Sequence, residues 1–399
     1  MIKKLFKISF GALLFVAAFL FSVIFYLQRV EEKQEFNAEE TQKISYTPLV
    51  SVVPGNLLPA NVKTSKSNNN LDIVKFSNRY YFAFRSAPVH FASEEAILYV
   101  VSSADLKMWE YETQFRFGSD VREPRFMTFK GKLFLYFFKG GSNMFSFAPE
   151  HIYATEFISK TKWTKPKPVY KPGYVIWRAK EHDGKTYMSV YYGVGLYSNE
   201  TDPGHLQLLQ STDGYNYKLV NNKEVSNETS AEEGEFEFDK EGNLYATIRL
   251  EMKGGKVCRA KKEALSDWEC KFTPYKYDSA LMFRHNDEFY VIARRNVAGT
   301  YNRDSKFLPK FLRSKWYLVR YSLTRKRTAM YRLDKEKLEL EPLFDFPSRG
   351  DTAYAGIVKV SGNQYYVLNY STDINGPDTN WLWGQFFGSN IYETYLEFK

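Results

Sequence analysis

A pattern of two short strands joined by a tight turn recurs along this chain and constrains its fold more than any other feature. The pattern is clearest over residues 232–249, EEGEFEFDKEGNLYATIR, where Glu and Phe alternate before a turn that contains Gly and Asn. Alternation with a period of two predicts a strand, and such a turn between two strands predicts an antiparallel hairpin. In this hairpin Glu232, Glu233 or Glu235 lies beside Arg249, at one end of the sheet.

Five further segments repeat this arrangement, each with an inner strand, an aromatic second strand and two outer strands around another tight turn. The predicted inner strands begin near Leu71, Glu123, Val175, Glu233, Ser279 and Tyr354. Repeats of roughly 45–75 residues built from short strands are typical of β-propellers. The sequence therefore predicts an all-β fold, a six-bladed β-propeller of four-stranded antiparallel blades. Five blades, or a β-sandwich, are the alternatives.

The last unit shows only three strands, the third over residues 391–398. An early strand-like segment, residues 45–50, has no unit of its own. A ring closed by strands from both ends of the chain leaves no exposed sheet edge. We therefore expect residues 45–50 to complete the last blade.

Composition supports an aromatic β-sheet core and an anionic partner. The chain of 399 residues contains 33 Phe and 30 Tyr and carries a formal net charge of +9. A positive balance favours acidic glycans, phospholipid headgroups or nucleic acid as partners. Nucleic acid is excluded here, because the Lys and Arg residues are scattered and the chain has the features of an exported protein.

The amino-terminal region has the pattern of a membrane anchor. Residues 8–27 form an apolar run long enough to span a bilayer as a helix, preceded by Lys3, Lys4 and Lys7. This charge distribution predicts a cytoplasmic amino terminus and a propeller outside the cytosol, in a single-pass membrane protein. The predicted segments are a basic cytoplasmic segment (1–7), an uncleaved transmembrane signal anchor (8–27), a polar stalk (28–45) and the propeller domain (46–399).

The two cysteines, Cys258 and Cys270, flank another predicted hairpin. In an oxidising compartment a disulfide across its two strands is expected. Two ligands do not make a zinc site, and we expect neither a metal nor a cofactor.

Three turns between third and fourth strands share a Ser, an Asp and an aromatic residue. They begin at Ser103, Ser211 and Ser266. In such turns the Ser and Asp side chains bond to main-chain amides while the ring packs between sheets. These turns resemble, in shortened form, the Asp-box turns of the sialidase superfamily.

Three further motifs resemble sialidases in their order and blade placement. Glu233 precedes Arg249 by one hairpin, Arg295 ends a second strand in DEFYVIARR, and Tyr354 opens the last unit in GDTAYAGIV. The resemblance covers roughly residues 70–398 and is closest to bacterial sialidase-like propellers. It implies that Tyr354 is the nucleophile, that Glu233 is its base, and that Arg249 and Arg295 hold a substrate carboxylate.

Three more arginines open or end inner-sheet strands and are further candidates for binding an anionic sugar: Arg85, Arg122 and Arg178. No motif identifies a general acid, although Asp120, Glu94 and Glu95 lie in suitable loops.

The chain departs from the sialidase pattern in its first unit. Sialidases have Arg-Ile-Pro there, whereas this chain has Asp72-Ile73-Val74. The nearest motif, Arg-Glu-Pro at residues 122–124, opens the second unit and is similar to the Arg-Asp-Pro of five-bladed fructan- and arabinan-cleaving enzymes. Those enzymes use three carboxylates, which here would be Asp72, Glu123 and Glu233.

Three functions therefore remain open. The first is a membrane-anchored glycoside hydrolase of sialidase type that acts on acidic glycans. The second is a glycosidase that uses carboxylates alone. The third is a propeller without hydrolytic activity that binds a glycan or another surface component.

Overall fold

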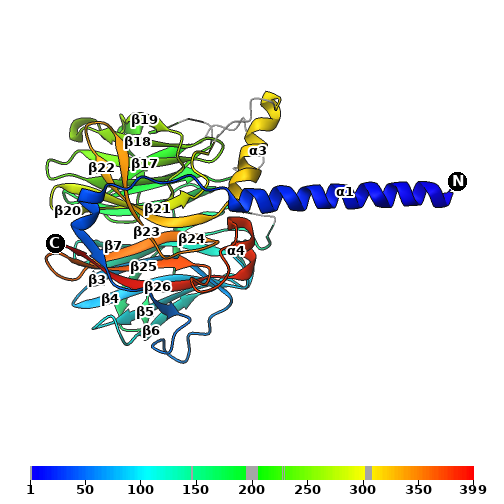
Figure 1. Cartoon of the computed structure of the whole chain (residues 1–399). Coiled ribbons are helices and arrows are strands. Elements are labelled where there is room, and N and C mark those ends of the chain that lie inside the picture. The colour runs from blue at the N-terminus through cyan, green and yellow to red at the C-terminus, as the bar shows by residue number, and fades with distance from the viewer. Residues whose placement is uncertain (1, 145–146, 195–204, 227, 229, 302–307) are drawn as a thin grey trace.

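The computed structural model describes residues 2–144, 147–194, 205–226, 228, 230–301 and 308–399, without the side chains of residues 2–13, 310, 311 and 314. Six antiparallel sheets are arranged as the blades of a propeller (Figure 1). In five sheets the strands follow one another from the first, inner strand outwards, and in the sixth the outermost strands come from the start of the chain. The predicted six-bladed, all-β fold is confirmed.

The first three blades follow one another in the sequence. Blade one contains β3 (Ser67–Phe76), β4 (Arg79–Ala87), β5 (Ile97–Ser103) and β6 (Glu110–Phe115). Blade two contains β7 (Val121–Phe129), β8 (Lys132–Lys139), β9 (His151–Ser159) and an outer edge divided into β10 (Lys162–Trp163) and β11 (Lys167–Val169). Blade three contains β12 (Tyr174–His182), β13 (Lys185–Tyr192), β14 (Leu206–Ser211) and β15 (Lys218–Leu219).

The other three blades complete the ring. Blade four contains β16 (Ala231–Phe238), β17 (Leu244–Leu250), β18 (Gly255–Ala260) and β19 (Glu269–Thr273). Blade five contains β20 (Asp278–His285), β21 (Glu288–Asn296), β22 (Lys326–Asp334) and β23 (Glu339–Phe346). Blade six contains β24 (Thr352–Lys359), β25 (Gln364–Ser371), β26 (Asn390–Phe398) and two early strands, β1 (Ile44–Tyr46) and β2 (Val50–Val53).

In the described residues, six helical segments lie outside the sheets. They are α1 (Ile2–Arg29), α2 (Ala38–Gln42), α3 (Lys310–Ser322), α4 (Trp381–Phe387) and the short 3-10 helices η1 (Val220–Asn222) and η2 (Lys262–Ala264). Helix α3 connects the second and third strands of blade five, and α4 does the same in blade six. Both helices therefore lie on the side of the propeller where the inner strands begin.

The expected closure of the ring is confirmed. Strand β1 pairs with β26, with Ile44 opposite Phe398 and Tyr46 opposite Leu396. The first strand of the propeller thus joins the last strand of the chain, so that strands from both ends share blade six. The two early strands cover the outer edge of β26, which is the physical advantage of such a closure.

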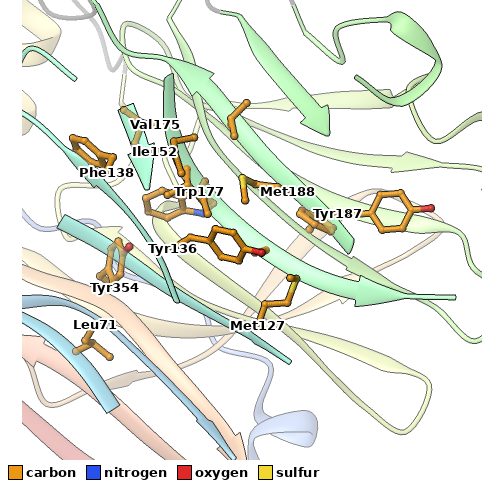
Figure 2. Close-up of a cluster of buried hydrophobic side chains, with 14 of the residues drawn as sticks. Leu71, Met127, Tyr136, Phe138, Ile152, Val175, Trp177, Tyr187, Met188 and Tyr354 are labelled. Atoms are coloured by element: carbon orange, nitrogen blue, oxygen red, sulfur yellow. The ribbon is translucent and has the colours of Figure 1, made fainter. Parts of the chain in front are cut away.

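The core lies between neighbouring blades. Inner and second strands such as β8 are buried along almost their whole length, because both faces of each sheet pack against another blade. Figure 2 shows this packing close to the axis, where Leu71, Trp177 and Tyr354 come from three different blades. The rings of Trp177 and Tyr354 meet edge to face, with their centres 5.3 Å apart.

Two local features predicted from the sequence, the disulfide and the Ser-Asp turns, are also present. Cys258 and Cys270 lie opposite each other on β18 and β19 and form a disulfide. In the first of the Ser-Asp turns the Ser103 hydroxyl accepts the Leu106 amide at 2.9 Å, while Asp105 accepts two further amides. These contacts fix the turn and are remote from the propeller axis.

The predicted transmembrane segment, residues 8–27, lies within α1, which extends away from the propeller (Figure 1). Part of that segment, residues 8–13, lies outside the residues whose side chains are described. Within the described part of the chain, no helix combines the length and apolar character needed to cross a membrane.

Candidate functional site

The inner strand of every blade is interrupted by a β-bulge near its start. Strand pairing shifts register there in all six blades. The residues at the shifts are Asn70, Glu123, Trp177, Glu233, Ser279 and Tyr354. A bulge changes the direction in which a side chain points and often occurs beside a functional site. Here all six side chains line one cavity at the centre of the ring.

Backbone strain accompanies these bulges. Glu123, Glu233 and Tyr354 have positive φ angles of 58°, 46° and 68°. Residues other than glycine rarely adopt this conformation, and such strain concentrates at functional sites. The cavity volume is about 400 Å³, within the range of small-molecule sites.

Glu233 is held by the hairpin that the sequence predicted. Its Oε1 lies 2.5 Å from Nη1 of Arg249, and its Oε2 accepts the main-chain amide of Ser279 at 2.6 Å. Burial alone would lower the pKa of Arg249, but Asp278 and the surrounding glutamates raise it well above its ordinary value. Glu233 and Arg249 therefore form a buried ion pair in the cavity wall.

Glu123 occupies the equivalent position on blade two but has a different environment. The side chain is buried, and its Oε2 has no hydrogen-bond partner among the described residues. Burial, and then the charge of Glu233, raise the pKa of Glu123 to about 8, against the opposing influence of Arg125 and Arg122. Glu123 is consequently protonated at neutral pH and can donate a proton.

Tyr354 lines the same cavity from blade six. Its hydroxyl is buried and makes no hydrogen bond within the described part of the chain. Burial raises the pKa of Tyr354 well above its ordinary value, although Arg125 acts in the opposite direction. The oxygens of Glu233 bond to Arg249 and Ser279 rather than to this hydroxyl. Tyr354 is therefore a neutral phenol in the unliganded protein.

The predicted arginines divide into two groups. Arg122 and Arg249 line the cavity, whereas Arg295 does not. Arg295 makes its ion pair with Asp345, to which its Nε donates at 2.9 Å. Its neighbour Arg294 lines the cavity in its place, because successive residues of a strand point to opposite faces of the sheet.

Arg85 and Arg178 are also outside the cavity lining. The Nε of Arg85 donates to Asp120 at 2.8 Å, and the Nε of Arg178 donates to Glu235 at 2.6 Å. Burial lowers the pKa of Arg85 to about 10, which still leaves it charged at neutral pH. Each is a buried ion pair that connects neighbouring parts of the ring.

The guanidiniums that do line the cavity are also paired with carboxylates. Arg122 pairs with Asp120, and Arg249 donates to Glu251 as well as to Glu233. Buried charges need partners, and acidic neighbours supply them here.

The three-carboxylate alternative loses one member. Asp72 does not line the cavity, and its Oδ2 accepts the main-chain amide of Phe126 at 2.7 Å. Asn70, two residues earlier, takes the blade-one position, because the bulge turns that side chain towards the axis. The other two carboxyl groups of this alternative, those of Glu123 and Glu233, line the cavity. Among the residues suggested as the general acid, Asp120 forms ion pairs with Arg85 and Arg122. Glu94 and Glu95 are exposed and lie outside the cavity lining.

Several cavity residues were missed in the sequence. Besides Arg294, they include Glu251 and His90, whose Nδ1 lies 2.6 Å from Oδ2 of the buried Asp351. Burial would raise the pKa of Glu251, but Arg249 and Lys276 lower it to about 2. Aligning the six units on their inner strands would have revealed the bulge positions. The His–Asp pair, from blades one and six, leaves no such signal.

No group of His, Cys, Asp and Glu residues in the described ranges could hold a metal ion. The chemistry available in the cavity includes that of three carboxyl groups, those of Glu123, Glu233 and Glu251, together with three guanidiniums and the Tyr354 phenol.

Comparison with known proteins supports the fold. No known protein family and no curated protein matches the sequence. A protein of unknown function from Dyadobacter fermentans has a similar structure, with a TM-score of 0.63 and 14% identity over 90% of this chain and 100% of that one. Trypanosoma rangeli sialidase is also similar, with a TM-score of 0.58 and 12% identity over 89% of this chain.

The present chain spans 59% of the trypanosomal sialidase structure. The complex of that sialidase with sialic acid gives a TM-score of 0.55 at 11% identity. At these identities the likeness concerns the fold. This chain is a six-bladed β-propeller with the fold of the sialidase propellers.

Proposed function

We propose that this protein is a glycoside hydrolase in which Glu123 and Glu233 are the catalytic pair. The observation that supports this most strongly is the contrast between two carboxyl groups at equivalent bulges. Glu123 retains its proton because of its raised pKa, whereas Glu233 is paired with Arg249. A protonated carboxyl group and a second carboxyl group that is paired with an arginine can serve as acid and base in one site.

In this mechanism each carboxyl group has one role. The Glu123 carboxyl donates its proton to the oxygen of the leaving group as the glycosidic bond breaks. The Glu233 carboxylate faces the anomeric carbon and either attacks it directly or removes a proton from the attacking water. The ion pair with Arg249 and the Ser279 amide hold Glu233 in position.

The charge of the cavity favours a substrate with an acidic group. Three guanidiniums line it, those of Arg122, Arg249 and Arg294. Carboxylates of the protein pair with Arg122 and Arg249, whereas the carboxylates nearest to Arg294, those of Asp278 and Asp351, lie 3.8 and 4.0 Å away. Guanidiniums bind carboxylates through paired hydrogen bonds, so an acidic sugar is the class of substrate that we propose.

A sialidase-type mechanism is the second candidate, with Tyr354 as nucleophile and Glu233 as its base. It is favoured by the position of the Tyr354 hydroxyl, which lines the cavity without a hydrogen-bond partner in the described structure. A sialic acid carries its carboxylate on the anomeric carbon, which repels a carboxylate nucleophile but not a phenol. One structural neighbour is Trypanosoma rangeli sialidase as a covalent intermediate with 2,3-difluorosialic acid.

We also propose that the propeller works outside the cytosol. The disulfide between Cys258 and Cys270 supports this location, because disulfides persist mainly in oxidising compartments.

A panel of fluorogenic glycosides, neutral and acidic and including sialosides, tests the function. Glu123→Gln and Glu233→Gln should each lower kcat by at least about a hundredfold. Glu95→Gln is the matched control, since Glu95 is exposed and outside the cavity. Tyr354→Phe separates the two mechanisms: turnover survives if the carboxyl pair suffices and is abolished if Tyr354 is the nucleophile.

Absence of turnover across the panel would refute both mechanisms. If the purified protein still bound acidic glycans, as measured by calorimetry, the non-catalytic propeller would be the correct function.

A further inference from the structure

An exposed apolar surface borders the mouth of the cavity. On α4 the side chains of Trp383, Phe386 and Phe387 are 46%, 39% and 62% exposed. Trp383 and Phe387 stack on each other with their ring centres 6.1 Å apart. Large aromatic side chains that stay exposed together usually mark a binding surface.

Helix α3 extends this surface. Leu312 and Val319 are exposed and lie seven positions apart, with exposed Lys315 between them. Residues at this spacing lie along one stripe of a helix. The two helices are in contact, with the rings of Tyr321 and Trp381 5.7 Å apart. We refer to Leu312, Val319, Trp383, Phe386 and Phe387 as the mouth rim.

The mouth rim is continuous with the cavity. Leu318 of α3 and Leu382 of α4, which neighbour rim residues in sequence, both line the cavity. Phe386 also packs against Phe91, another lining residue, with ring centres 5.0 Å apart. The cavity therefore has charged groups near the propeller axis and an apolar entrance between α3 and α4.

A second apolar surface leaves the propeller on the same side. Figure 1 shows α1 extending outwards from the side that carries α3 and α4. Its base is fixed there, since Gln28 donates to the main-chain oxygen of Asp378, in the loop before α4. Described side chains of α1 such as Phe15 and Phe21 are exposed. Two apolar surfaces from distant parts of the sequence thus lie on the same side of the propeller.

We propose that the mouth rim docks on the surface of a lipid bilayer and that the sugar entering the cavity is the headgroup of a membrane lipid. The second part rests on the proposed function, whereas the docking does not. Trp and Phe are well suited to the boundary between lipid headgroups and acyl chains. Lys315 and the formal net charge of +9 favour anionic bilayers.

Docking is measured with the full chain and vesicles of phosphatidylcholine and phosphatidylglycerol that carry brominated acyl chains. Bromine quenches a tryptophan that reaches the acyl region. Wild type should be quenched more than Trp383→Phe, which keeps an aromatic ring but removes this reporter. Equal quenching of the two proteins, or no association of wild type with the vesicles, would overturn the proposal.

A triple variant, Trp383→Ser with Phe386→Ser and Phe387→Ser, tests the surface itself. Its vesicle partition coefficient should fall by about tenfold or more, because three apolar side chains no longer leave water. Phe272→Ser is the matched control, since Phe272 is similarly exposed on the outer strand of blade four and should leave partitioning unchanged. Near-wild-type melting temperatures show that both variants fold. Unchanged partitioning of the triple variant would contradict docking by the rim.

A second measurement separates the two proposals. An acidic sugar is presented either as a soluble glycoside or as the same sugar on a lipid in vesicles. The triple variant should raise KM for the lipid-borne sugar only and keep wild-type kcat on the soluble one. Vesicle docking without hydrolysis of either form would refute the proposed function alone. Hydrolysis of both forms with equal KM in wild type and variant would refute the lipid-borne substrate alone.

Discussion

The guanidinium carbon of Arg125 lies 4.2 Å from the centre of the Tyr354 ring, and the same guanidinium lies 5.0 Å from the Trp177 ring. Its Nε donates to the main-chain oxygen of Trp177, while Nη1 and Nη2 have no hydrogen-bond partner among the described residues. The cationic side chain of Arg125 thus stabilises the rings of Trp177 and Tyr354, which are two of the six residues at the bulges. Arg125 is not in the cavity lining, so it contacts these lining residues from outside the cavity.

Arg125→Ala should reduce the free energy of unfolding by about 3 kcal/mol, because it removes a desolvated cation–π contact and leaves space in the core. Urea unfolding followed by tryptophan fluorescence measures this loss. Arg79→Ala is the control: Arg79 is partly exposed in its ion pair with Glu110, and should cost less than about 1 kcal/mol. Equal effects of the two changes would contradict the structural role of Arg125.

The raised pKa of Glu123 predicts a pH dependence of hydrolysis. A general acid must carry its proton, so kcat/KM should fall as the pH rises through about 8, where Glu123 ionises. The pH profile of a good fluorogenic substrate measures this decline. With a substrate whose leaving group needs no protonation, the decline should disappear. A profile that stays flat through this pH range with both substrates would exclude Glu123 as the acid.

The same pKa shift predicts a pH dependence of stability. The pKa of Glu123 is raised by burial from an ordinary 4.5 to about 8, so the folded protein binds this proton more tightly than the unfolded chain does. Its contribution to stability is complete below pH 4.5 and is lost as the pH rises through 8.

Glu123→Gln should therefore unfold with less pH dependence and be more stable than wild type above pH 8, by on the order of a few kcal/mol. Chemical unfolding at several pH values measures this difference. Glu95→Gln should follow wild type throughout, because Glu95 is exposed.

The disulfide between Cys258 and Cys270 should be intact in protein taken from its native compartment. Alkylation under non-reducing conditions followed by mass spectrometry detects it, and free thiols at both positions would contradict the proposed location. Replacing both cysteines by Ser should lower the free energy of unfolding by about 2–3 kcal/mol. Reduced wild type should show the same loss, whereas the reductant should leave the Ser variant unchanged.

Much of the fold could be predicted because its signals are local. Alternating side chains and turn residues marked each inner strand, and the strand starting near Tyr354 lies within β24 (Thr352–Lys359) as expected. The partner of the last strand was predicted because an open ring leaves an unpaired edge. The amino-terminal helix is different. Its apolar run was visible in the sequence, yet the described part of the chain contains no helix that meets the requirements for crossing a membrane.

The site was predictable only in part. Glu233 and Arg249 belong to one hairpin, so their contact follows from the sequence. Arg295 was chosen over Arg294 because pattern alone does not show which residue of a strand faces the axis. Asn70 rather than the predicted Asp72 lines the cavity from blade one, since a bulge shifts the alternation of the strand by one residue.

The six blades, their closure and the disulfide could be predicted from the sequence alone. They depend on strand alternation and turn residues, on the cost of an open sheet edge, and on two cysteines that lie close along the chain. Only the tertiary structure decided which side chains meet at the axis and which of them holds a proton. Glu123 is neutral because the folded chain buries it near Glu233, two blades away. Burial and the distance to another charge are properties of the assembled ring, and no single blade contains them.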